Sequence, residues 1–130
     1  MANPNIVSVA TIYGQSMGEA LTTTVTTDIM TCQSEKILKI NYIGVSNTHA
    51  TNSTVVTVAV TKIGYTSGGI GASEDNVGTF KLASTVNLPA DDALIVLDKP
   101  IYLMEGDQLE AGANPATADI FVSFEVIDDA

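Results

Sequence analysis

The chain has 130 residues, 45% apolar and 15% charged, and this balance predicts one packed domain over residues 1–130 rather than a disordered chain. Fifteen acidic residues, five lysines and no arginine give a net charge of −10, which disfavours a nucleic-acid partner because phosphate binding requires cations. No apolar run reaches the roughly 18 residues that span a bilayer, and residues 1–5 lack a secretory-signal pattern, so we expect a soluble protein without a membrane partner.

The first two candidate strands lie near the N-terminus. Residues 6–13 (IVSVATIY) form an apolar run that ends at Gly14, and residues 1–14 are expected to form either an edge strand or an extended arm. Residues 20–27 (ALTTTVTT) hold β-branched side chains at nearly every position and fit no helical period, which predicts a second strand.

The next two candidate strands show the clearest patterns. Residues 36–46 (KILKINYIGVS) change apolar phase midway, and a bulge near Asn41 would bring both halves to one face. Residues 54–63 place valines at alternate positions, as in a strand with one buried face. The polar segment 47–53 between them favours a turn, so the two strands are predicted to form a hairpin.

Residues 64–78 contain five of the ten glycines and no buried pattern, which predicts a long exposed loop. Its segment Ser73-Glu74-Asp75-Asn76 offers oxygen ligands, but without the spacing of a calcium loop, so no metal site is assigned. Gly68-Gly69-Ile70-Gly71 is followed by no Gly-Lys-Ser/Thr sequence and is therefore interpreted as a flexible loop rather than a phosphate-binding one.

Short strands separated by turn residues continue to the C-terminus. The polar turn Glu105-Gly106-Asp107 predicts a second hairpin between the strands that flank it. Alternation in the last strand places Ile120, Val122, Phe124 and Val126 on one face and Phe121, Ser123, Glu125 and Ile127 on the other. The expected strands are residues 79–84, 86–88, 93–97, 101–104, 109–111 and 119–127.

Seven to nine short strands with no substantial helix predict an all-β, single-domain antiparallel sandwich of Ig-like or jelly-roll topology. Side chains for chemistry are sparse: the single cysteine, Cys32, is expected to be a small buried hydrophobe, and the single histidine, His49, a solvated turn residue. Two such residues cannot form a zinc site, and the acidic pairs lie in expected turns. We therefore expect no catalytic residues, no metal, no cofactor and no enzymatic activity.

Several segments together resemble small virion structural proteins of tailed bacteriophages, especially short proteins from large phages of marine bacteria and cyanobacteria. The resemblance covers most of the chain, from about Ile6 to Ile127, and its motifs are structural rather than catalytic. The loop at residues 64–78 is longer than this pattern. The segments that carry the resemblance are Thr11-Ile12-Tyr13-Gly14, Lys39-Ile40-Asn41, Val45-Ser46-Asn47, Asn52-Ser53, Val86-Asn87-Leu88-Pro89-Ala90-Asp91-Asp92-Ala93-Leu94, Ile101-Tyr102-Leu103-Met104-Glu105-Gly106-Asp107 and Ser123-Phe124-Glu125.

The resemblance implies a decoration (cement) protein on the outer capsid of the virion, assembled in the host cytoplasm, with the major capsid protein or other virion proteins as partners and a homotrimer as the oligomer. A neck, tail or fibre-attachment component is the alternative. Ile6, Val7 and Tyr13 near the N-terminus and Ile70 in the glycine loop are the expected partner contacts. A carbohydrate or host-surface binding module is a further alternative, disfavoured because the chain has no tryptophan and only four tyrosines to stack on sugars.

Overall fold

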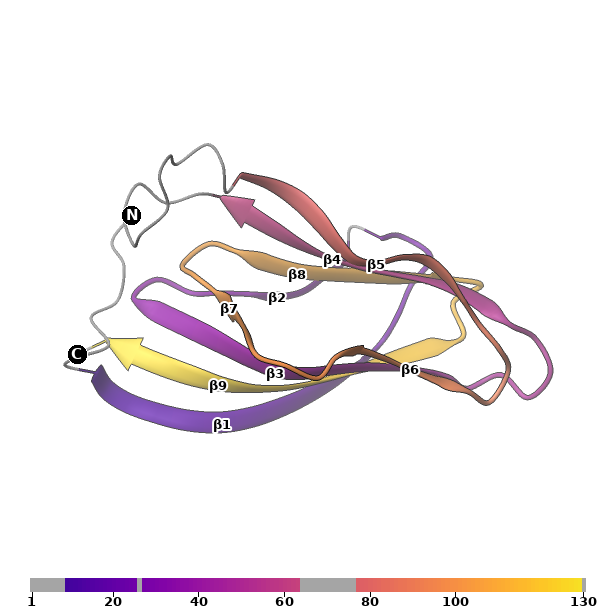
Figure 1. The fold of residues 1–130 in the computed structure, drawn as a ribbon, viewed down its shortest axis with the longest axis horizontal. Helices are drawn as coiled ribbons and strands as arrows, with labels where there is room; N and C mark the ends of the chain where they lie inside the picture. The colour runs from indigo at the N-terminus through magenta and orange to yellow at the C-terminus, as the bar shows by residue number, and fades with distance from the viewer. Residues whose placement is uncertain (1–8, 26, 64–76, 130) are drawn as a thin grey trace.

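The structure, a computed structural model, describes residues 9–25, 27–63 and 77–129, and this part of the chain folds into two antiparallel sheets packed face to face (Figure 1). It confirms the predicted all-β sandwich. Among the described residues there is no helix long and apolar enough to cross a membrane. The strands are β1 (Val9–Ala20), β2 (Thr27–Thr31), β3 (Lys36–Asn47), β4 (Thr54–Ile63), β5 (Val77–Leu88), β6 (Ala93–Leu97), β7 (Ile101–Leu103), β8 (Gln108–Asn114) and β9 (Ala118–Asp129).

The strand order identifies the topology as a jelly roll. Sheet A has the order β1-β9-β3-β6, with β7 also paired to β3, and sheet B has the order β2-β8-β4-β5. When the three-residue β7 is set aside, β8 and β9 become the seventh and eighth strands, and the sheets run 1-8-3-6 and 2-7-4-5. This is the order produced by two interlocked Greek keys. The structure therefore favours the jelly roll over the Ig-like alternative.

Both hairpins predicted from the sequence are wrong. β3 belongs to sheet A and β4 to sheet B, so residues 48–53 cross between the sheets instead of joining paired strands. β7 pairs with β3, whereas β8 pairs with β2 and β4, so the turn that contains Asp107 is also a crossing. Polar turn residues predict where the chain reverses, but they do not say in which sheet the next strand lies.

The core lies between the sheets and consists of alternating side chains from both. The bulge predicted near Asn41 is confirmed, because the β3–β9 register shifts between Ile40 and Tyr42 and brings Ile40 and Ile43 into the core. The alternation predicted for the last strand is also confirmed. Side chains that are at most 1% exposed include Ile40, Ile43, Val45, Val56, Val58, Leu103, Leu109, Ile120 and Val122.

The threonine-rich segment 20–27 is not the strand that the sequence predicted. Ala20 ends β1, which passes through Gly14, and the chain then crosses to sheet B, where β2 begins at Thr27. The crossing lies directly on Gly112, because a Cβ at that position would be 2.8 Å from the backbone of Val25. β-branched residues suit an extended chain, and here the extended chain connects the sheets instead of pairing within one.

Two predicted elements on either side of the glycine-rich segment have changed bounds. Residues 64–76 of the predicted loop lie outside the described residues, and Val77 and Gly78 already belong to β5. β5 joins the two predicted strands at 79–84 and 86–88 into one. Thr85, with φ of 47°, lies where its pairing with β4 shifts register, so a bulge replaces the expected break.

Candidate functional site

The side chains that usually carry chemistry have structural roles in this fold. Among the described residues there is no group of three or more histidine, cysteine or acidic side chains that could hold a metal ion. Cys32 is 2% exposed and its thiol lies 3.2 Å from the Lys36 carbonyl oxygen, to which it donates. Burial raises the pKa of this thiol to about 11, so it stays protonated at neutral pH and is a poor nucleophile.

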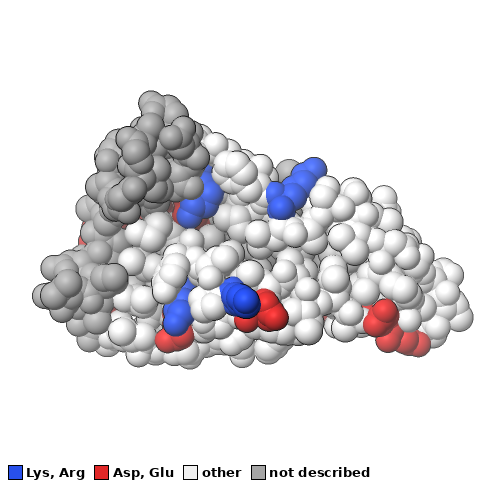
Figure 2. Space-filling model, in the orientation of Figure 1, with Lys and Arg blue, Asp and Glu red and all other residues white. Residues whose placement is uncertain are grey.

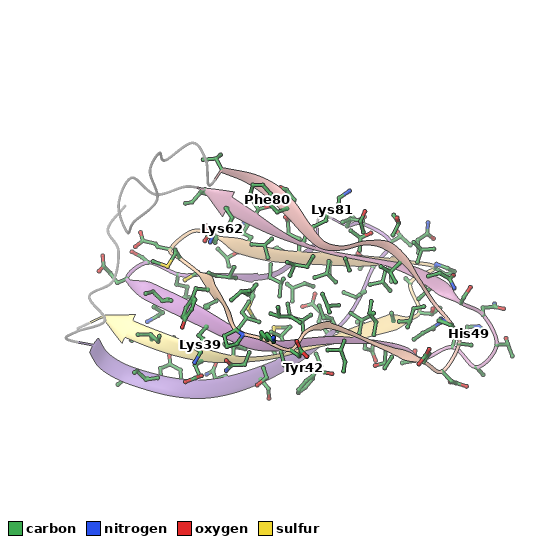
Figure 3. The ribbon with its side chains drawn as sticks, in the orientation of Figure 1. Lys39, Tyr42, His49, Lys62, Phe80 and Lys81 are labelled. Atoms are coloured by element: carbon green, nitrogen blue, oxygen red, sulfur yellow. The ribbon has the colours of Figure 1, made fainter. Side chains whose placement is uncertain are left out.

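His49 lies in a connection between strands, as the sequence predicted, and is half-buried, but it has fixed hydrogen-bond partners that the sequence did not reveal. Its Nδ1 accepts hydrogen bonds from the backbone N–H groups of Thr51 (3.1 Å) and Asn52 (3.0 Å). The ring therefore holds the crossing between β3 and β4 at one end of the sandwich, where Figure 3 places it. Within the described residues, the hydrogen-bond partners of the ring are these two backbone groups, so its arrangement is that of a structural turn residue.

Asn47, the last residue of β3, is a buried side chain that connects three loops. It is 2% exposed, and its Nδ2 donates to carbonyl oxygens while its Oδ1 accepts from two donors. The partners are Asn52 O (2.8 Å), Leu88 O (3.1 Å), Pro89 O (3.2 Å), His49 N (3.0 Å) and Thr117 Oγ1 (3.0 Å). Asn47 therefore joins two of the segments that resemble phage proteins, residues 45–47 and residues 86–94. We call this hydrogen-bonded group around Asn47 the amide hub.

Asp107 supports the opposite end of the sandwich. Its carboxylate is fully buried and forms an ion pair with Lys62, whose side chain is 16% exposed. It also accepts hydrogen bonds from the backbone N–H groups of Met104 (2.9 Å) and Ile63 (3.2 Å). Both oxygens of this buried carboxylate therefore have donors, and the pair ties sheet B to the β7–β8 crossing.

The outer face of sheet A exposes an apolar patch, which we call the apolar face. Its members come from β1, β9, β3, β6 and β7, so it extends across the whole sheet, and they are between 36% and 61% exposed. The register puts Tyr42, Phe121 and Ile95 in neighbouring rows of the sheet, and exposed apolar side chains that lie together mark interaction surfaces more often than single scattered ones do. The members are Ile12, Tyr42, Ile95, Tyr102 and Phe121.

Glycines in two strands make the middle of the apolar face flat. The register aligns Gly18, Phe121, Gly44 and Ile95 in one row across four strands. A Cβ at Gly18 would lie 3.2 Å from the Phe121 ring, and one at Gly44 would lie 2.7 Å from Cζ of Tyr42. The Phe121 ring therefore lies against the backbone of Gly18 and the Tyr42 ring against that of Gly44, so this part of the face is flat and covered by aromatic rings.

Charges on and beside the apolar face are largely paired. Lys39 lies 3.6 Å from Glu125, and the pKa of Glu125 is lowered by a hydrogen bond from the Asn41 side chain and then by Lys39. Lys36 lies 3.0 Å from Asp128, which raises the lysine pKa. Figure 2, drawn from one side of the molecule, shows lysines against acidic residues and wide uncharged areas between them. Pairing lowers the desolvation cost of covering such a surface.

Strands β4 and β5 of sheet B also expose apolar side chains, Val55, Ile63, Val77, Phe80 and Leu82, but part of this sheet is polar. One cross-strand row contains Thr31, Gln108, Thr61 and Thr79. The Thr61 hydroxyl is hydrogen-bonded to that of Thr79 (2.8 Å) and donates to Glu110. Thr61 and Thr79 bond each other and Thr31 donates to Asp28, so this row is polar, whereas the row through Phe121 and Ile95 is apolar.

An apolar crevice opens along the side of the sandwich where β1 and β2 are the outermost strands. Tyr13 and Met17 from β1 line it together with Met30 from β2 and Phe124 from β9. Tyr13, one of the expected contact residues, is 40% exposed there. Ile6, Val7 and Ile70, the other expected contacts, lie outside the described residues.

Sequence reasoning missed the apolar face, although part of the signal was available. Alternation grouped Phe121 with Ser123 and Glu125 on one face of its strand, and a phenylalanine in such polar company is already informative. Tyr42 and Ile95 carry no comparable signal, because only the order of the strands brings them near Phe121.

Comparison with known proteins finds no family model that matches the chain, no match among curated proteins and no match among solved structures. The functional argument therefore depends on the residues and surfaces described above.

Proposed function

We propose that this protein is a non-enzymatic structural protein of a tailed-phage virion, a decoration protein that binds the outer surface of the major capsid lattice. The observation that carries the proposal is the apolar face: exposed rings and aliphatic side chains on a sheet that no described residue covers. A surface of this kind gains free energy when another protein surface covers it. The buried polar side chains Asn47 and Asp107 take part in structural hydrogen bonds, which supports a role without catalysis.

The fold and the net charge are compatible with this proposal, but neither is specific to it. Jelly rolls occur in viral capsid proteins and also in lectins and other classes, so the fold favours no single function. The net charge of −10 disfavours adhesion to other polyanions, which suits a protein on a particle surface. The resemblance noted in the sequence points to the same class.

Binding to capsids that lack the protein tests the proposal. We expect labelled protein to bind saturably, at a fixed ratio to the major capsid protein, and Phe121→Lys to weaken binding at least about tenfold because it buries a charge in the interface. Asn87→Lys, an equal charge change at an exposed position of β5, is the matched control and should bind as the unaltered chain does. Absence of saturable binding, or equal binding by both variants, would contradict the proposal.

A carbohydrate-binding module is the second candidate, and the exposed rings favour it. Tyr102 and Phe121 are about half exposed, and Tyr42 lies flat over Gly44, an arrangement on which a sugar ring can stack. Screening against a glycan panel separates the two functions. Saturable glycan binding that is lost in Phe121→Ser, together with no binding to capsids, would replace the decoration proposal.

A further inference from the structure

The described residues leave four sheet edges, and three of them are protected against pairing with another strand. Exposed edges attract other strands unless they are short, charged or bulged. β2 and β6 have five residues each and β7 has three. β5 is long, but it carries Lys81 and its pairing shifts register twice. These edges therefore show the features with which natural proteins avoid edge-to-edge association.

β1 lacks these protections. It has twelve residues and, within the described part of the chain, pairs with β9 alone. Its register with β9 is regular from Thr11 to Ala20, with the single shift lying between Val9 and Thr11. No charged side chain precedes Glu19 in the sequence. Within the described residues, one side of β1 thus presents backbone groups that pair with no other strand, along a regular stretch without charged side chains from Val9 to Gly18.

The crevice beside β1 adds apolar area to this edge. Tyr13 and Met17 project from β1 into the crevice, and Met30 faces them from β2. Ile12, on the opposite side of the strand, is 58% exposed. A strand that paired with β1 would therefore gain backbone hydrogen bonds and cover apolar side chains on both faces of the sheet.

We propose that β1 is a dimerisation edge: a second copy of this chain pairs its own β1 antiparallel to the first, joining two five-stranded A sheets into one continuous sheet. A two-fold axis brings identical strands together in antiparallel orientation, so one self-complementary strand is sufficient. The inference concerns the chain alone and holds independently of the proposed function.

The residues of β1 fit a second copy of the same strand. Two chains that each carry −10 repel one another, but residues 9–18 of β1 carry no charged side chain that would add to this repulsion at the joint. A register centred on Gln15 places Tyr13 opposite Met17 and Ile12 opposite Gly18 of the other copy. Gly18 lies beside the Phe121 ring, so Ile12 would extend the apolar face across the joint. The apolar faces of both copies would then form one surface.

Charge substitutions at Gln15 test this geometry, because the axis brings the two copies of that residue together. The mass of the purified chain is measured by sedimentation over a submillimolar concentration series. We expect a dimer for the unaltered chain, and for Gln15→Lys and Gln15→Glu alone a dimer dissociation constant raised at least about tenfold by like-charge repulsion. Mixing the two variants should restore dimers, since the opposed charges then attract.

Asn87→Lys, which adds the same charge to the protected β5 edge, is the control and should remain a dimer. Circular dichroism of each variant confirms that the sandwich is folded. A monomeric unaltered chain would overturn the proposal, as would dimers that persist in both Gln15 variants or a mixture that fails to associate. A trimer, as the phage resemblance implies, whose mass does not respond to residue 15 would also overturn it.

Discussion

The two ends of the sandwich differ in the side chain that satisfies their buried polar groups. At each end the chain crosses between the sheets and buries polar backbone groups. At one end the neutral amide of Asn47 bonds four backbone groups and the Thr117 hydroxyl, whereas at the other the charged carboxylate of Asp107 bonds two backbone N–H groups with Lys62 as its counter-ion. Figure 3 shows His49 and Lys62 marking these opposite ends. The buried polar residues Asn47 and Asp107 thus stabilise the crossings between the sheets. We therefore expect binding on the surface of the sandwich.

Removing the amide hub should have the largest effect on stability. In Asn47→Ala, the carbonyls of Leu88 and Asn52 and the hydroxyl of Thr117 lose their partner in a buried site. We expect the free energy of unfolding to fall by about 3–5 kcal/mol, measured by urea unfolding. Asn87→Ala, at an exposed position, should change it by less than about 0.5 kcal/mol. Equal small effects of both variants would show that the hub is not structural.

Breaking the ion pair should cost somewhat less and should be partly reversible. Lys62→Met leaves the buried Asp107 carboxylate without its counter-ion, and we expect a loss of about 3 kcal/mol in urea unfolding. Adding Asp107→Asn removes the uncompensated charge while the amide oxygen can still accept from a backbone N–H. The double variant should therefore be more stable than Lys62→Met alone. A double variant less stable than the single one would contradict the importance of charge at this end.

Cys32 lies beside Asp107, and its titration should make the charged end sensitive to high pH. The folded thiol has a pKa of about 11 against an ordinary value of 9.0, so its contribution to stability is present below pH 9 and is lost as pH rises toward 11. We expect a loss of about 2 kcal/mol over this window. In Cys32→Ala the corresponding loss should be smaller by that amount. Parallel pH profiles for both chains would refute the effect.

A substitution on the apolar face should have the smallest effect on stability. Phe121 is 51% exposed, so Phe121→Ser should lower the free energy of unfolding by no more than about 1 kcal/mol, measured by thermal or urea unfolding. A much larger loss would mean that the ring holds the fold together rather than serving a partner.

Local patterns predicted the strands better than their pairing. Valine alternation predicted residues 54–63, and the turn residues that follow Leu97 delimited residues 93–97, both with the bounds seen in the structure; the phase change near Asn41 located a bulge. Both hairpins failed because partner choice depends on side chains distant in sequence, which a local window does not contain. The extended threonine segment failed because a crossing and a strand have the same backbone preference.

The candidate site was less predictable than the fold for the same reason. Asn47 and Asp107 are adjacent to polar turn residues, and nothing in their neighbours' sequence distinguishes a buried hub from a solvated turn. Tyr13 was singled out near the N-terminus, but its place in the crevice depends on β2 and β9. The apolar face depends on strands that are brought together only by the jelly-roll order.

The central claim, that the chain is a structural protein of a phage particle, is tested most directly by quantitative mass spectrometry of purified particles of the phage that encodes it. The decoration proposal predicts a copy number near that of the major capsid protein. A few copies per particle would assign the chain to the neck or tail instead. Absence from the particles would contradict the claim.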